Sequence, residues 1–147
     1  MRKFRRAVAM SSAALALASA ATLTLAGSAS ADTTVCGPPQ GGTSGAPWYG
    51  YTMIPCVAKY AQGQYYSYVT MSGGSTDVRV YTGVYNKCDG VTYGINGDSA
   101  SNHIYPGGGT VYSNWAYTSC SLGVWGIARL TNNGVGSPWA WSEKMPY

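Results

Sequence analysis

The chain has 147 residues and a formal net charge of +4, from nine basic and five acidic side chains. Four of the basic residues lie within the first six positions, so residues 32–147 carry five basic and five acidic side chains, whose charges cancel. Nucleic-acid binding and polybasic membrane binding both require clustered cations. The charge balance therefore excludes nucleic acid and a membrane surface as partners of residues 32–147.

The first 31 residues resemble a secretory signal peptide, which has a basic start, an apolar middle and a small-residue exit. The basic start is Arg2–Arg6, the apolar middle covers residues 7–26, and Ala29-Ser30-Ala31 fits a signal-peptidase site. A membrane anchor is the alternative, because the apolar stretch approaches the length of a spanning helix. Its Ala, Ser and Thr content and the cleavage site favour removal. We therefore expect a secreted, extracellular protein that begins at Asp32.

Four cysteines lie beyond the predicted cleavage site: Cys36, Cys56, Cys88 and Cys120. An even number in an exported domain predicts two disulfides. Of the three possible pairings we favour Cys36–Cys56 and Cys88–Cys120, because residues near in sequence close a loop at a lower entropic cost. A zinc site would need closely spaced ligands, and the nearest two cysteines are 20 residues apart. No metal and no cofactor is therefore expected.

The predicted elements begin with a loop over residues 37–47, which are rich in Gly and Pro. We expect residues 32–47 to form a flexible arm tethered at Cys36, and residues 48–147 to form a single β domain. After the arm, residues 57–62 fit either a short strand or one helical turn. The sequence leaves these two alternatives open.

The clearest strands follow at residues 64–71 and 77–85, where side chains alternate with the period of two that half-buried strands have. In the first of them, Tyr65, Ser67, Val69 and Met71 share one face, and Tyr66, Tyr68 and Thr70 share the other. The turn residues Ser72-Gly73-Gly74-Ser75 separate the two strands. Together they predict a β-hairpin.

The remaining predicted strands are shorter or less regular. They cover residues 91–95, 110–117, 124–131 and 138–141, and turns follow at Asn96-Gly97, 106–109 and 132–134. Gly123 and Gly126 indicate a bulge in the strand at 124–131. No stretch has a sustained helical period. The pattern predicts a small, disulfide-stabilised, antiparallel all-β domain, either a β-sandwich or a barrel.

The aromatic composition is the most informative feature for function. Residues 32–147 hold 13 Tyr and five Trp, whereas the single Phe lies in the predicted signal peptide. Tyr and Trp combine an apolar ring with a polar group, which suits surfaces that bind sugars or proteins. They also pack well in strands, so many of them are expected to be structural. The predicted binding residues are two clusters, one beside the Gly/Pro loop and one near the C-terminus: Trp48, Tyr49, Tyr51, Trp139 and Trp141.

No catalytic motif is recognisable. A Ser-His-Asp arrangement would have to use His103, the single histidine, and no Gly-x-Ser-x-Gly motif is present. None of the five acidic residues lies in a motif typical of glycoside hydrolysis. We expect His103 to be a loop residue and the protein not to be an enzyme.

Three hypotheses for function follow. The first is a secreted, non-catalytic protein-binding domain, such as a hydrolase inhibitor or a subunit of an exported assembly, because a rigid disulfide scaffold loses little entropy on binding. The second is a carbohydrate-binding module that uses surface Trp and Tyr residues on a polysaccharide. The third is a small secreted hydrolase that uses His103.

Overall fold

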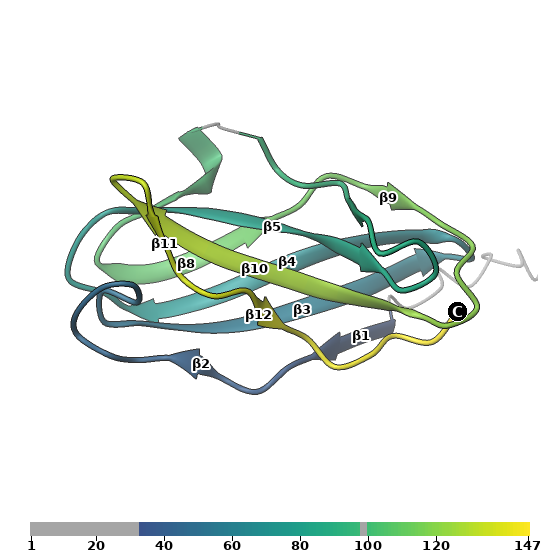
Figure 1. Cartoon of the computed structure of the whole chain (residues 1–147), viewed down its shortest axis with the longest axis horizontal. Helices are drawn as coiled ribbons and strands as arrows, with labels where there is room; N and C mark the ends of the chain where they lie inside the picture. The colour runs from purple at the N-terminus through teal and green to yellow at the C-terminus, as the bar shows by residue number, and fades with distance from the viewer. Residues whose placement is uncertain (1–32, 98–99) are drawn as a thin grey trace, which may run out of the picture.

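The computed structural model describes residues 33–97 and 100–147, which form two antiparallel sheets packed face to face (Figure 1). Sheet A contains β1 (Thr33–Cys36), β2 (Gln40–Gly41), β3 (Tyr51–Ala61), β4 (Gln64–Gly73), β8 (Gly107–Tyr112) and β9 (Ala116–Tyr117). Sheet B contains β5 (Val78–Asn86), β6 (Thr92–Tyr93), β7 (His103–Ile104), β10 (Val124–Asn132), β11 (Val135–Gly136) and β12 (Ala140–Trp141). One short 3₁₀ turn, η1 (Ala100–Asn102), precedes β7. The predicted antiparallel all-β fold is confirmed, and its architecture is a sandwich.

The predicted signal peptide, residues 1–31, lies outside the described residues. Within the described part of the chain, no helix is long and apolar enough to cross a membrane.

Alternating side chains build the core between the sheets, as the sequence pattern predicts. Along β4, Tyr65, Ser67 and Val69 are fully buried, whereas the neighbouring Tyr66 and Tyr68 are only half-buried. The inward side chains of β3, β4, β5 and β10 form two apolar clusters, one toward each end of the sandwich. Each sheet therefore has one face in the core and one face in solvent.

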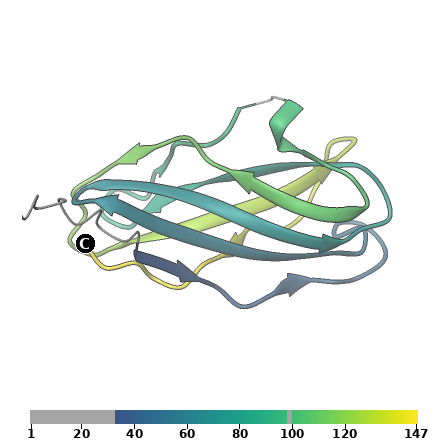
Figure 2. The same ribbon diagram turned by 180° about the vertical axis from the view of Figure 1, so that it is seen from behind.

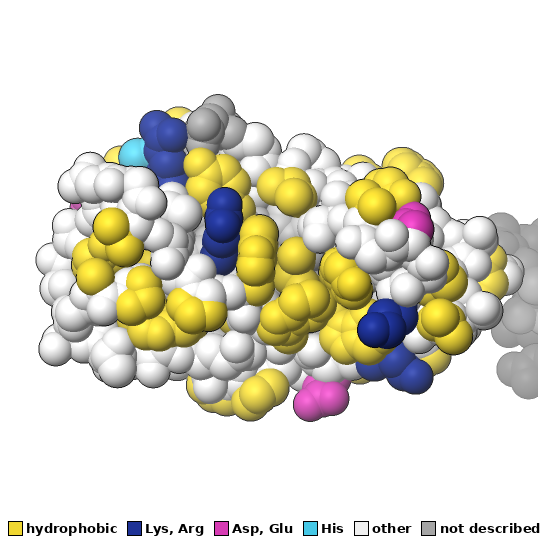
Figure 3. Space-filling view, viewed as in Figure 1, with side chains coloured by type: hydrophobic (Ala, Val, Ile, Leu, Met, Phe, Trp, Pro, Cys, Tyr) yellow, Lys and Arg dark blue, Asp and Glu magenta, His cyan; other side chains and the backbone are white. Residues whose placement is uncertain are grey.

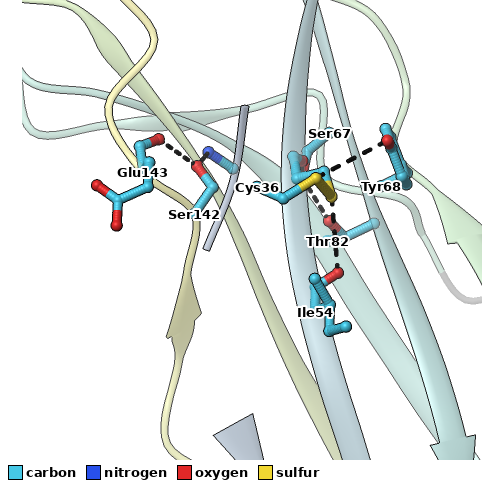
Figure 4. The surroundings of a disulfide bond; sticks show 9 residues. Cys36, Ile54, Ser67, Tyr68, Thr82, Ser142 and Glu143 are labelled. Atoms are coloured by element: carbon cyan, nitrogen blue, oxygen red, sulfur yellow. Dashed lines mark hydrogen bonds between the residues drawn. A yellow bond between two sulfur atoms is a disulfide. The ribbon is translucent and has the colours of Figure 1, made fainter. Parts of the chain in front are cut away.

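Two buried hydroxyls link the sheets between these clusters. The Oγ of Ser67 on β4 lies 2.8 Å from the Oγ1 of Thr82 on β5 (Figure 4). The same Oγ lies 3.0 Å from the carbonyl oxygen of Cys56, and the Thr82 hydroxyl lies 2.9 Å from that of Ile127. Because buried polar groups are costly without partners, these contacts explain how two hydroxyls are tolerated in the core.

The predicted hairpin between residues 64–71 and 77–85 is wrong. Both strands exist, as β4 and β5, but they belong to different sheets. The observed hairpin joins β3 to β4 through a tight turn in which Gly63 has a φ of 75°, while β5 pairs with β10. Alternation shows which residues share a face, but it does not identify the neighbouring strand.

Three other segments settle or correct the sequence-based expectation. Residues 57–61 are strand, the second half of β3, which settles that open alternative. The strand predicted at 110–117 is interrupted: β8 ends at Tyr112 and β9 begins at Ala116. Within the predicted N-terminal arm, β1 and β2 both pair with β3, so this part of the arm belongs to sheet A.

Both predicted disulfides are confirmed. Cys36–Cys56 joins two residues that lie directly opposite each other on β1 and β3. Figure 4 shows this disulfide beside Tyr68, whose hydroxyl lies 4.0 Å from the Sγ of Cys36. Cys88–Cys120 joins the turn after β5 to the segment between β9 and β10. The second disulfide therefore connects an element of sheet B with the chain that leaves sheet A.

The bulge predicted at Gly126 is absent, since the β5–β10 register runs in single steps from Val124–Asn86 to Thr131–Arg79. Gly126 serves a different purpose there. A Cβ on this residue would lie too close to the carbonyl oxygen of Cys56 and 2.9 Å from the Oγ of Ser67, both on the opposite sheet. A glycine at this position permits the close approach of the two sheets.

We therefore expect Gly126→Ala to lower the free energy of unfolding by about 1–3 kcal/mol, because the added methyl group pushes against backbone. Denaturant unfolding of the variant measures this change. Gly136→Ala on β11 is the matched control, since its Cβ would meet no atom closer than 3.5 Å. Equal stability of the two variants would contradict this reading of the sheet contact.

Candidate aromatic binding site

Five aromatic side chains form a continuous cluster on the outer face of sheet A, the face turned toward the viewer in Figure 2. We call this cluster the aromatic platform: Tyr60, Tyr66, Tyr68, Tyr112 and Trp115. Strand pairing brings them together, because Tyr68 on β4 lies directly opposite Tyr112 on β8. Tyr60 lies near the end of β3, and Trp115 lies in the short connection between β8 and β9.

Three tyrosines form the floor of the platform. The ring centres of Tyr66, Tyr68 and Tyr112 lie 5.6–6.4 Å apart, and their planes differ by 32–40°. Such spacing is typical of aromatic pairs that stabilise each other across strands. The three rings therefore form a compact triangular group on the sheet surface and hold one another in place.

Trp115 stands edge-on beside the tyrosine rings and forms a wall of the platform. Its ring centre lies 5.0 Å from that of Tyr66 with an angle of 77° between planes, and 5.6 Å from that of Tyr60 with an angle of 63°. These rings border an open pocket of about 430 Å³. Its lining is Tyr60, Tyr66, Tyr112, Ser113 and Trp115. The platform is thus a notch with an upright side rather than a plane.

The connection that carries Trp115 is firmly attached on both sides. The backbone N–H of Ser113 donates to the carbonyl of Ser67 at 2.8 Å, and the Ser113 hydroxyl accepts from the N–H of Ser67 at 2.8 Å. On its other side, the N–H of Asn114 donates to the carbonyl of Gly94 at 2.7 Å. These bonds hold the two residues before Trp115, one of them to β4 of sheet A and the other to Gly94, which directly follows β6 of sheet B.

The exposure of the platform exceeds what packing requires. Tyr60, Tyr112 and Trp115 expose 53%, 60% and 46% of their surface. The pocket is lined only by aromatic residues and a serine, with no charged side chain. A contiguous, exposed, uncharged aromatic surface of this kind is typical of a binding site.

The residues predicted beside the Gly/Pro loop have mainly structural positions. Tyr51 is fully buried in the core, and its hydroxyl donates to the carbonyl of Thr76 at 2.9 Å. Burial raises the pKa of Tyr51, and the nearby charge of Asp77 raises it further. Trp48 and Tyr49 are half-buried against the same core cluster. Tyr51 therefore cannot present its ring to a ligand.

The residues predicted near the C-terminus lie at sheet B, on the side of the sandwich away from the platform. Trp141 on β12 packs edge-on against Tyr85, with ring centres 5.1 Å apart, and is 39% exposed. Trp139 lies beneath the guanidinium group of Arg129, which is 4.8 Å from the ring centre. Both belong to the outer face of sheet B, whereas Trp48 and Tyr49 pack against the core.

His103 occurs on β7 rather than in a loop, and its Nε2 accepts a hydrogen bond of 3.0 Å from the Nε of Arg79. A histidine whose Nε2 faces an arginine is poorly placed to act as a general base toward a serine. Among the described residues, no group of three or more His, Cys, Asp or Glu side chains is arranged to hold a metal ion.

The sequence contained part of the signal for the platform. Alternation over residues 64–71 places Tyr66 and Tyr68 on one face together, but it does not say which face is exposed. Tyr112 and Trp115 join them only through the β4–β8 pairing and the interruption after β8. These pairings are long-range contacts, which a local pattern does not reveal.

Comparison of the chain with protein families, with curated proteins and with solved structures finds no match.

Proposed function

We propose that residues 32–147 form a secreted, non-catalytic module that binds a neutral polysaccharide by stacking sugar rings on the aromatic platform. The observation that carries this proposal is the continuous cluster of exposed and half-buried rings on sheet A, with Trp115 upright beside it. Export and removal of residues 1–31 are part of the proposal. Two disulfides support it, since disulfides persist in oxidising compartments.

The chemistry of a sugar matches this surface. One face of a hexose ring presents C–H groups, which pack against an aromatic ring, while its hydroxyls project sideways and need polar partners. The Tyr hydroxyls supply such partners. A neutral sugar also suits a pocket without charges, because no ion has to be desolvated.

A protein partner, the first expectation from the sequence, fits this face less well. Protein interfaces are rich in aromatic residues and also in arginine, and their rims are polar. The platform has the aromatic residues without the arginine, and both arginines of residues 32–147 lie on sheet B. We therefore keep protein binding as the competing outcome of the experiment.

We expect Trp115→Ala to weaken binding to an insoluble neutral polysaccharide by about 10- to 30-fold, because loss of a central aromatic residue typically costs about 2 kcal/mol. Depletion assays with the insoluble polysaccharides cellulose and chitin measure the affinity. Tyr112→Ala should also weaken binding.

Tyr117→Ala is the matched control. This residue is 68% exposed on β9 of the same sheet but makes no ring contact with the platform. If the wild type binds none of the polysaccharides and instead captures a secreted protein in a Trp115-dependent manner, the proposal is overturned in favour of protein binding. Equal loss in Tyr117→Ala and Trp115→Ala would also contradict it.

A further inference from the structure

The outer face of sheet B has a second concave site, on the side of the sandwich away from the platform. The cavity has a volume of about 670 Å³ and lies where β5, β7 and β10 meet the turn after β10. Its polar lining includes Asp77, Arg79, His103, Arg129, Asn132 and Asn133. Unlike the platform, this site is rich in charged groups and hydrogen-bond donors.

Among the described residues, the lining has an excess of positive charge. Two of the five basic residues of the predicted mature chain, Arg79 and Arg129, line the cavity, and Asp77 is the acidic residue of this described lining. With His103 neutral, these side chains sum to a formal charge of +1. The cavity therefore favours an anionic group, because a concave wall strengthens the local potential.

Arg129 is held in a defined position. Its guanidinium carbon lies 4.8 Å from the ring centre of Trp139 and 5.9 Å from that of Tyr81. Contact with aromatic faces orients a guanidinium group while leaving its hydrogen-bonding edge for other partners. An orientation set in advance reduces the entropic cost of binding an anion.

The hydrogen bonding of Arg129 is incomplete within the described residues, since its Nε is buried and has no partner there. Because this buried donor is out of reach of solvent, a ligand in the cavity would have to bind the two Nη groups of the guanidinium. An arginine fork binds a carboxylate through two parallel hydrogen bonds, which is the chemistry best matched to this residue.

Arg79 is positioned by its neighbour across the sheet. Arg79 on β5 lies directly opposite His103 on β7, and its Nε donates to the Nε2 of His103 at 3.0 Å. This bond orients the second guanidinium group at the cavity wall. His103 therefore positions the guanidinium group of Arg79 and has no catalytic role in this proposal.

Aromatic rings continue from the cavity along the same face. Figure 3 shows the outer face of sheet B, with hydrophobic side chains along its length and Lys or Arg side chains among them. Beyond Tyr81 and Trp139, Tyr85 packs against Trp125 and Trp141 with ring centres 6.3 and 5.1 Å apart. A ligand that combines a carboxylate with stackable rings matches this arrangement.

We propose that this cavity binds the carboxylate of an acidic sugar, such as a uronic acid within a glycan, through Arg129 and Arg79. The neighbouring aromatic rings stack on the adjoining sugars, and the side-chain amides of Asn132 and Asn133 offer partners to their hydroxyls. None of these residues belongs to the platform, so the two binding proposals can fail separately.

The test is calorimetric titration of residues 32–147, with both disulfides intact, by a short oligogalacturonate and by its methyl ester, which has the same sugars without the charge. We expect the ester to bind at least tenfold more weakly. Arg129→Gln should reduce affinity for the acid at least tenfold and leave affinity for the ester unchanged. Arg79→Gln provides a second variant, and thermal unfolding of each variant confirms that it is folded.

Lys87→Gln is the charge-matched control, because Lys87 is exposed in the turn after β5 and does not line the cavity. It should bind the acid as the wild type does, and so should Trp115→Ala. Equal affinity for acid and ester, or no binding of the acid, would overturn the proposal. Binding of poly-glutamate as tight as that of oligogalacturonate would overturn the assignment to a sugar.

Discussion

Replacing Tyr51 by alanine is expected to lower the free energy of unfolding by about 3–5 kcal/mol, as is typical when a large buried ring is removed from a core. Tyr51 is fully buried among the apolar residues of one core cluster. Its hydroxyl donates to the carbonyl of Thr76 at 2.9 Å and lies 3.4 Å from that of Ile104. Chemical denaturation of the variant measures the loss.

Tyr51→Phe is the matched control, since it keeps the ring and removes only the hydroxyl. We expect it to cost about 1–3 kcal/mol, because the two carbonyls lose a buried partner. If Tyr51→Ala instead left stability unchanged and abolished ligand binding, Tyr51 would be a binding residue and its assignment to the core would be wrong.

Removing the disulfide between Cys88 and Cys120 is expected to destabilise the domain by about 2–5 kcal/mol, the usual cost for a small disulfide-bonded domain. Cys120 is buried in the second core cluster, and the disulfide closes 32 residues. The same region is held by a hydrogen bond of 2.8 Å from the Nδ2 of Asn86 to the hydroxyl of Thr118. The double variant Cys88→Ala/Cys120→Ala, studied by thermal unfolding, tests this.

Cys36→Ala/Cys56→Ala is the comparison variant. It should cost less, because its disulfide closes 20 residues and ties only the short edge strand β1 to β3. A larger loss from this second pair would show that β1 contributes more to stability than its edge position implies.

Aromatic residues lie on both outer faces of the sandwich, but the two sites differ in charge. The platform pocket on sheet A has no charged side chain in its lining, whereas the cavity on sheet B has two arginines beside its rings. The two proposals therefore place a neutral chain and an acidic chain on opposite sides. Independent loss of neutral and acidic binding in Trp115→Ala and Arg129→Gln would establish this division.

Local patterns in the sequence were sufficient to predict the all-β class, the strands at 64–71, 77–85 and 124–131, and both disulfides. They succeed because alternation reports the two faces of a strand, and because loop-closure entropy favours pairing of nearby cysteines. The abundance of Tyr and Trp likewise predicted that some of these side chains lie on the surface, where Tyr60, Tyr112 and Trp115 are exposed.

Only the tertiary structure decided which strands are neighbours and which face each tyrosine occupies. The hairpin prediction failed because the chain crosses from sheet A to sheet B between β4 and β5. Tyr51 and Tyr66 look alike in sequence, yet one lies in the core and the other in the platform. Strand partners separated by more than 40 residues, such as Tyr68 and Tyr112, create the aromatic surface. The physical reason is that burial and pairing are properties of the packed sheets, which no local stretch of sequence contains.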